Sequence, residues 1–332
     1  MANQQFPLLR LPPSAVSYVL RRTNQISIIS FSIISNRMKT AVKAINFTIP
    51  HMELMLGQQS CIKFRLPGTI RWVLRKENFA EWTGTDDINE PLFLCSGHFC
   101  VKVTYRKRGY TLKNWLDHFV EISKKTEFDV LYLSKPQEEI NLDGLRQHIG
   151  SVRGIYLQRA YDLPFHENLL ANFPTTKRFY VLLPANAERV SSKIVVPNFD
   201  LISIEHLNLV KLDDLLIMNA KVIQLNNTAF TDADINRFLK SWKTGSCSRL
   251  KILTIRLRRQ SNLERILRGT GYQNAPAERE KTFEVYNVRS TESLEKTVVG
   301  GQDIREKNGR IGTVSVVQRR NITMELNFYV WE

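Results

Sequence analysis

The chain has 332 residues and a formal net charge of +15 at pH 7, with 43% hydrophobic and 24% charged residues. This composition excludes a disordered chain, and the length suits about two globular domains. The charge favours nucleic acid, an acidic protein or a membrane surface as a partner. Because the basic residues are scattered and no nucleic-acid-binding motif accompanies them, we do not expect nucleic acid.

Residues 6–46 contain no Asp or Glu, and they predict three short helices. Pro12 and Pro13 suit a first helical turn, where a missing N–H costs nothing. Asn24 is a favourable N-cap for a second helix, and Ser35 or Asn36 could start a third. The opening of the chain is therefore expected to be a small helical module.

This module would carry more apolar side chains than it can bury by itself. Val16, Val19 and Leu20 fall on one face of the first helix at i, i+3 and i+4 spacing. Residues 26–34 are apolar apart from their serines, yet they are too few to span a bilayer. We therefore expect another protein to cover the remaining apolar surface.

Residues 47–107 change to an alternating pattern that predicts strands. Residues 62–66 and 70–74 alternate on either side of a Pro67–Gly68 turn. The segment that follows, residues 110–125, is a predicted amphipathic helix. Its apolar stripe is Trp115, Leu116, Phe119 and Ile122, with Leu112 at its start.

A loose repetition of short alternating strands occupies the middle of the chain. The strands are predicted at residues 128–134, 152–158, 177–184, 201–209, 220–228 and 250–257. Helical segments lie between several of them, and Thr231 is the expected cap of one whose stripe contains Ile235, Phe238, Leu239 and Trp242. A strand and a helix every twenty to thirty residues are typical of leucine-rich repeats, here with irregular spacing. An ordinary α/β domain with a parallel sheet is the alternative.

The C-terminal part predicts a small sheet that caps the repeat. A strand at residues 281–288 precedes a hairpin whose Asn308–Gly309 turn is a strong signal. In the last strand, Leu326, Phe328 and Val330 share one face. Such a sheet would cover the exposed edge of the repeat.

The sequence carries no recognised catalytic motif, with no Walker A, G-x-S-x-G, H-E-x-x-H or kinase signature. Cys95, His98 and Cys100 could supply three metal ligands, but a structural zinc site needs four. We therefore expect no metal, no cofactor and no catalytic residue. Four cysteines are too few for a disulfide framework, and the start of the chain lacks a signal-peptide pattern. We expect a cytoplasmic or nuclear protein with no membrane partner.

The opening segment resembles an F-box. The resemblance rests on Leu11–Pro12, then Val16, then Val19–Leu20, followed by the apolar second helix and residues 35–42. Two features depart from the motif: no acidic residue occurs at positions 13–15, where one is common, and the third helix has no tryptophan.

The remainder resembles the F-box-associated domain, type 2, of F-box families expanded in nematodes. The resembling pieces are residues 6–12, 109–122, 215–255, 300–316 and 328–331, and 215–255 is the most specific. Together with the strand pattern, the resemblance implies a mixed α+β and α/β fold in three segments. These are a three-helix F-box at 1–46, a strand-rich connecting region at 47–110, and an irregular leucine-rich-repeat-like α/β arc at 111–332 capped by a C-terminal β-hairpin sheet.

The resemblance also implies a non-catalytic substrate-recognition subunit of a Skp–cullin–F-box ubiquitin ligase. It would bind a Skp-family adaptor, and through it a cullin, with Leu11, Pro12, Val16, Val19, Leu20, Ile28 and Phe31. An unidentified protein target would contact strand residues of the arc, for which the candidates are Tyr132, Tyr156, Gln158, His206, Gln224 and Asn226. The alternative function is a basic leucine-rich scaffold that binds protein or RNA without a ubiquitin role, and an enzyme is a third possibility.

Overall fold

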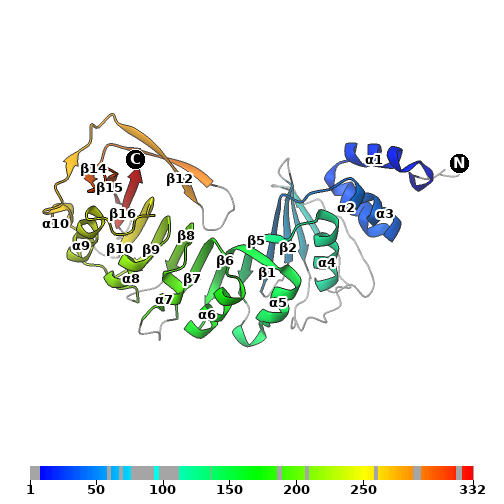
Figure 1. Cartoon of the computed structure of the whole chain (residues 1–332), viewed down its shortest axis with the longest axis horizontal. Coiled ribbons are helices and arrows are strands. Elements are labelled where there is room, and N and C mark those ends of the chain that lie inside the picture. The colour runs from blue at the N-terminus through cyan, green and yellow to red at the C-terminus, as the bar shows by residue number, and fades with distance from the viewer. Residues whose placement is uncertain are drawn as a thin grey trace. The chain divides into compact units, whose positions relative to one another are not determined.

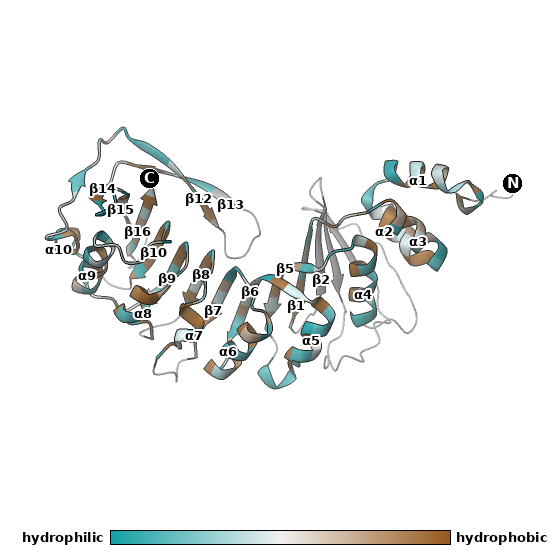
Figure 2. Cartoon of the chain, viewed as in Figure 1, coloured by the Kyte–Doolittle hydropathy of each residue, from teal (hydrophilic) through white to brown (hydrophobic). Residues whose placement is uncertain are grey.

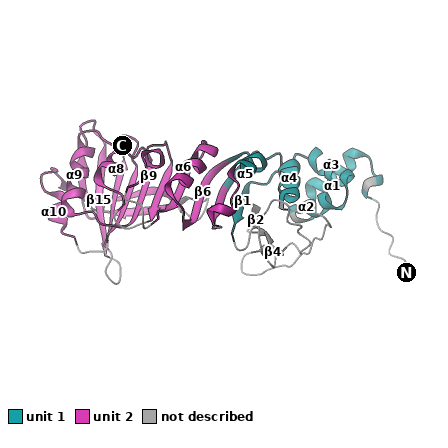
Figure 3. Cartoon of the chain, turned by 90° about the horizontal axis from the view of Figure 1, so that it is seen from below, with its two compact units in different colours: residues 1–129, 143–151 teal, residues 130–142, 152–332 magenta. Residues whose placement is uncertain are grey.

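The computed structural model describes residues 8–57, 61–66, 70–75, 93–96, 112–134, 136–184, 189–205, 209–257, 261–286, 293–318 and 324–331. The chain forms two compact units, which Figure 3 distinguishes by colour. Unit 1 comprises residues 1–129 and 143–151, and unit 2 comprises residues 130–142 and 152–332.

Unit 1 combines helices with an antiparallel meander. Its described elements are η1 (Leu8–Arg10), α1 (Pro13–Arg22), α2 (Gln25–Ile34), α3 (Asn36–Ala44), β1 (His51–Leu56), β2 (Cys61–Leu66), β3 (Ile70–Arg75), β4 (Phe93–Ser96), α4 (Leu112–Ser123), the start of β5 (Glu127–Leu133) and most of α5 (Leu142–Ile149). The strands pair antiparallel in the order β1-β2-β3-β4. The strands predicted around the Pro67–Gly68 turn are thus confirmed.

The first three helices begin where local capping allows. Pro13 opens α1 at a position where the backbone N–H that proline lacks would have no partner within the helix. The Asn24 side chain accepts a hydrogen bond from the backbone N–H of Ser27, and the Ser35 side chain accepts one from Met38. Both caps were expected from the sequence and are confirmed. Of the three helices, α2 is the most hydrophobic along its length (Figure 2).

Unit 2 is a mixed sheet with helices between its parallel strands. Its described elements are the rest of β5, η2 (Gln137–Glu139), β6 (Ser151–Ala160), α6 (Leu163–Asn172), β7 (Arg178–Leu182), α7 (Ser192–Val195), β8 (Leu201–Glu205), α8 (Leu212–Ile217), β9 (Val222–Thr228), α9 (Asp232–Lys243), β10 (Ile252–Leu257), α10 (Leu263–Leu267), β11 (Gln273–Asn274), β12 (Glu280–Tyr286), β13 (Ser293–Val299), β14 (Gln302–Arg305), β15 (Ile311–Gln318) and β16 (Met324–Trp331).

The sheet of unit 2 places its strands in the order β11-β14-β15-β16-β10-β9-β8-β7-β6. Strands β6 to β10 pair in parallel and in chain order, while β14, β15 and β16 pair antiparallel and join the sheet at β10. The six predicted central strands are therefore confirmed, as are the C-terminal hairpin and last strand at the edge of the sheet. The strand predicted at 281–288 forms as β12, but it belongs to a separate two-stranded sheet with β13. A regular leucine-rich repeat is not confirmed.

The core of unit 2 lies between the sheet and its helices. Figure 1 shows α6, α7, α8 and α9 on one face of the strands. The capping box between Thr231 and Asp234 starts α9, as the sequence predicts. Trp242 of α9 meets Phe328 of β16 edge to face, with ring centroids 4.8 Å apart. Strand residues that alternate with this set belong to the opposite face.

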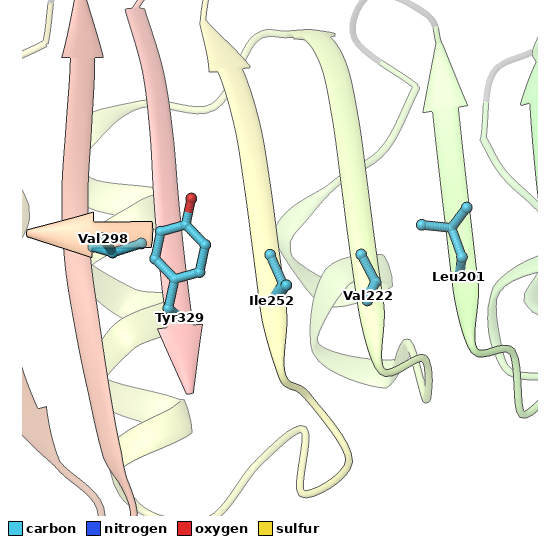
Figure 4. Close-up of a cluster of buried hydrophobic side chains, with 5 residues drawn as sticks. All are labelled: Leu201, Val222, Ile252, Val298 and Tyr329. Carbon is cyan, nitrogen blue, oxygen red and sulfur yellow. The ribbon is translucent and has the colours of Figure 1, made fainter. Parts of the chain in front are cut away.

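A two-stranded ribbon, formed by β12 and β13, lies on that opposite face. Register places Leu201, Val222, Ile252 and Tyr329 side by side on β8, β9, β10 and β16. Figure 4 shows Val298 of the ribbon beside Tyr329, and the five residues form one buried cluster. We call this side of the sheet the ribbon face.

Several predictions fall outside what can be compared. The last part of the strand pattern expected over residues 47–107, from residue 97 on, lies outside the described residues. The division into three domains, 1–46, 47–110 and 111–332, stays a prediction. The two compact units have other bounds, and a compact unit need not coincide with a domain.

Candidate functional site

Helices α1 to α3 possess a small core of their own. Val16 and Leu20 of α1 and Ile28 of α2 are buried, with Leu20 at 0% exposure, and Ile29 and Met38 are buried as well. Three of the seven residues expected to contact an adaptor thus lie in the interior. They support the shape of the surface and do not form it.

The other four expected residues are accessible. Pro12 and Val19 are exposed, and Leu11 and Phe31 are half-buried. Val19 sits one position before buried Leu20, so it lies at the rim of the inward face of α1. These four residues are available for contact with another protein.

The residues expected to contact the adaptor did not include two well-exposed apolar side chains of the same helices. Tyr18 is 58% exposed and Ile34 is 70% exposed. The guanidinium of Arg22 lies 3.7 Å from the centroid of the Tyr18 ring, which holds the ring on the outer surface. A signal for Tyr18 was present, because it is two positions from both Val16 and Leu20 and therefore points away from the buried face.

Helix α4 is joined to the first three helices by polar contacts. The Ser32 hydroxyl and the His118 ring nitrogen Nε2 are 2.9 Å apart, and both residues are buried. Lys43 Nζ and Glu121 Oε1 are also 2.9 Å apart, and Lys39 pairs with the same carboxylate. The Lys39 and Lys43 ammonium groups hold the pKa of Glu121 below its usual value. The helical module is therefore held to a fourth helix of the same unit, while Tyr18, Val19 and Ile34 stay exposed.

Charge on this module is one-sided. Residues 8–50 contain Arg10, Arg21, Arg22, Arg37, Lys39 and Lys43, with no Asp or Glu. Glu121 of α4 compensates the two lysines, whereas the four arginines are exposed. The exposed apolar residues of α1 thus sit in a positive field, which suits an acidic partner.

A second candidate surface is the ribbon face of unit 2. Across neighbouring strands the register aligns Tyr156, Tyr180, Ser203 and Gln224 in one row. The next residue of this row is Thr254, which pairs with Asn327. Polar side chains therefore cross the sheet from β6 to β16 beside the apolar cluster under the ribbon.

Aromatic stacking orders the β6 end of this row. The Tyr156 and Tyr180 rings stack with centroids 4.2 Å apart and planes 6° apart, and Tyr132 and Tyr156 are 5.3 Å apart. The Tyr180 hydroxyl donates a hydrogen bond to the Glu205 carboxylate. All three tyrosines are at most 9% exposed, so they act mainly as a rigid base for neighbouring groups.

A polar network orders the β16 end. Thr254 Oγ1 donates to Asn327 Oδ1 at 2.9 Å, and Asn327 in turn donates to Glu325 at 3.3 Å. Arg256 donates to Glu325 and to Asn226, each at 3.0 Å. The Arg256 side chain remains 43% exposed, while Glu325 is buried. This network fixes the exposed guanidinium in one orientation.

The structure brings four of the six expected target-binding residues to the ribbon face: Tyr132 and Tyr156 by stacking, and Gln224 and Asn226 by register. Gln158 is exposed on β6, and His206 lies outside the described residues. Tyr180 and Arg256 were missed. In each strand, every second residue lies on the ribbon face, and both Tyr180 and Arg256 fall in that set. This alternation is the signal that could have found them.

No metal or membrane element is found in the described part of the chain. There, no group of three or more His, Cys, Asp or Glu side chains is arranged to hold a metal ion. His98 and Cys100 lie outside the described residues, and the Cys95 side chain is not described. None of the described helices combines the length and apolar character needed to cross a bilayer.

Two segments of the chain match known protein families. Residues 8–50, which hold α1 to α3, match the F-box domain, and residues 191–255, from α7 into β10, match the F-box associated family. The chain carries an F-box and an F-box-associated domain. The resemblance to nematode-type F-box proteins is thereby confirmed, and the second match contains the segment 215–255 singled out from the sequence.

A curated relative supports the same assignment over more of the chain. The sequence is 24% identical over 263 residues to the F-box associated domain-containing protein sdz-33 of Caenorhabditis elegans. The similarity covers 77% of this chain and 80% of that protein. No solved structure matches the F-box protein described here.

Proposed function

We propose that this chain is the substrate-recognition subunit of a Skp–cullin–F-box ubiquitin ligase. The observation that carries the proposal is an F-box whose exposed apolar residues, Tyr18, Val19 and Ile34, lack a cover among the described residues. F-box families are generally adaptors without catalysis of their own. The chain would hold a target near the ligase's other subunits, which raises the effective concentration of target lysines. This role is in keeping with the cytoplasm or nucleus.

The adaptor would contact the exposed and half-buried residues. These are Pro12, Val19, Leu11 and Phe31, with Tyr18 and Ile34 in addition. Buried Val16, Leu20 and Ile28 would act by maintaining the helices. Skp-family adaptors are acidic, so Arg10, Arg21 and Arg22 would speed the encounter more than they deepen the affinity.

The target would bind the F-box-associated part. In the arc of parallel strands, which we liken to a degenerate leucine-rich repeat, the face opposite the helices is the natural contact surface. Gln158, Gln224 and Asn226 are the candidates for direct contact there, and buried Tyr132 and Tyr156 would support them. His206 remains a candidate on sequence alone.

Co-purification with a recombinant Skp-family adaptor and cullin tests the first contact. Val19→Asp places a carboxylate in the proposed interface, and we expect adaptor affinity to fall by about 30-fold or more, equivalent to about 2 kcal/mol. Because Val19 is 37% exposed, the fold should be retained. The matched control is Val196→Asp, at a 46% exposed valine of unit 2, which should leave adaptor binding unchanged.

If Val19→Asp recovers as much adaptor as the wild type, the proposed surface is wrong. If the wild-type chain recovers no adaptor at all, the ligase assignment itself fails. If the adaptor is recovered, affinity purification with mass spectrometry in proteasome-inhibited cells would identify targets, and it would compare the full chain with a chain that lacks residues 6–46.

A further inference from the structure

The β12–β13 ribbon differs from the other strands because it forms a separate two-stranded sheet. Its residues pair antiparallel from Glu280 opposite Val299 to Tyr286 opposite Ser293. Within the residues that the structure describes, β12 pairs with β13 and with no other strand. The outer edge of β12 therefore presents backbone N–H and C=O groups of the kind that accept a further strand.

The inner side of the ribbon is anchored to the sheet. Phe283 and Tyr329 have ring centroids 4.8 Å apart, and Val298 is buried in the cluster beneath. Lys281 lies 4.7 Å from the Trp331 ring centroid, and Lys296 lies 5.4 Å from that of Tyr329. A lone two-stranded ribbon is marginally stable in water, so these contacts give this one a fixed shape.

The base of the ribbon is held by a separate clamp. Arg279, directly before β12, forms a bidentate ion pair with Asp303 of β14 and donates to the Gly300 carbonyl at 3.1 Å. The Thr313 hydroxyl donates to the same carboxylate at 2.7 Å. The base and the middle of the described ribbon are thus attached to the sheet of unit 2, and the edge of β12 is preorganised.

The outer side of the ribbon carries negative charge, in a chain whose net charge is +15. Glu280, Glu284 and Glu295 are exposed, and Glu284 stands directly opposite Glu295. Like charges in directly opposed positions destabilise a strand pair. The two lysines of the ribbon cannot relieve this repulsion, because they alternate with the glutamates and reach the aromatic rings on the inner side.

We propose that the edge of β12 accepts an extended segment of the protein target as a third strand, bearing Lys or Arg opposite Glu280 and Glu284. These glutamates are four residues apart and share the outer side, so the added strand would carry its two cations at the same spacing. Backbone hydrogen bonds give affinity in strand addition, and alternate side chains give specificity. The proposal rests on the proposed function, which supplies a protein target.

Fluorescence anisotropy on the full-length chain tests this with synthetic peptides at physiological salt. The first probe is an eight-residue peptide of threonine and valine with two lysines four residues apart. The second has the same composition with adjacent lysines, and the third keeps the spacing but replaces two threonines between the lysines by proline, which removes backbone donors. We expect the first probe to bind at least about tenfold more tightly than either other peptide.

The variant pair Glu280→Gln with Glu284→Gln should weaken the first probe by about tenfold or more. Both side chains are exposed, so the ribbon should stay folded, and an unchanged melting temperature checks this. The control pair Glu138→Gln with Glu264→Gln makes the same charge change at exposed sites away from the ribbon and should leave binding unaltered. Hydrogen exchange should show slower exchange of β12 amides when the probe is bound.

Three outcomes would overturn the proposal: no binding of the first probe, equal binding of the proline peptide, or equal binding by the glutamine pair. The first outcome would show that no such site exists. The second would show that the peptide binds by charge attraction without backbone pairing, and the third that it binds at another part of the chain. None of them alters adaptor co-purification, so failure here is distinguishable from failure of the ligase assignment.

Discussion

His166 should limit the stability of unit 2, and replacing it should make the unit more stable. The ring lies on α6 at 0% exposure, and neither of its nitrogens has a hydrogen-bond partner among the described residues. Tyr161 and Phe179 meet it edge-on, at centroid distances of 6.3 Å and 6.4 Å. Burial lowers the pKa of His166 to about 4, and nearby Asp162 opposes that shift only in part.

Two magnitudes follow for His166→Leu. A buried polar atom without a partner costs about 1–3 kcal/mol, so the variant should gain about that much in unfolding free energy at pH 7.5. Because the folded pKa is depressed from 6.5 to about 4, the unfolded chain binds the proton first as the pH falls. The wild type should therefore lose about 3 kcal/mol between pH 6.5 and pH 4 through this residue, and the variant should not.

Urea unfolding by circular dichroism across this pH range measures both effects, with hydrogen exchange of α6 as a local readout. If His166→Leu parallels the wild type from pH 6.5 to 4, the account of a buried, unpartnered ring is wrong.

Further predictions concern the F-box and the C-terminal sheet. Leu20→Ala, at a fully buried site, should cost about 2–5 kcal/mol in unfolding free energy and reduce adaptor binding through loss of the helices, which circular dichroism would detect. Glu121→Gln should cost under about 1 kcal/mol at pH 7, because the carboxylate is 43% exposed, and the cost should vanish as pH falls through the lowered Glu121 pKa. Gly312→Ala should cost about 1–3 kcal/mol in thermal unfolding, since the added Cβ would lie 2.1 Å from the Phe328 ring; an unchanged melting temperature would contradict the packing described.

Local patterns carried most of what the sequence could predict. The cap at Thr231 and the stripe of Ile235, Phe238, Leu239 and Trp242 depend only on spacing within one helix, and the structure confirms them all. The same holds for the caps at Asn24 and Ser35. Strand alternation also placed Gln224 and Asn226 on the face away from the helices, because a period of two fixes which residues share a side.

Contacts between distant segments were beyond the sequence. Ser32 and His118 are 86 positions apart, and no local pattern reports that they meet. The row from Tyr180 through Ser203 to Asn327 depends on the register of both parallel and antiparallel strand pairs, which a single sequence does not state. The ribbon's position over Tyr329 likewise depends on packing of side chains far apart in the chain.

Because α4 contacts the first three helices, the part of the chain that packs together is longer than the segment that matches the F-box. A fragment ending at residue 50 would leave Ser32 without His118 and would strip Lys39 and Lys43 of their shared counter-charge. Chimeric proteins that exchange recognition modules between relatives should therefore be joined after Ser123. A junction placed at the end of the F-box match would transfer the first three helices without the helix that they contact, however similar the two sequences are.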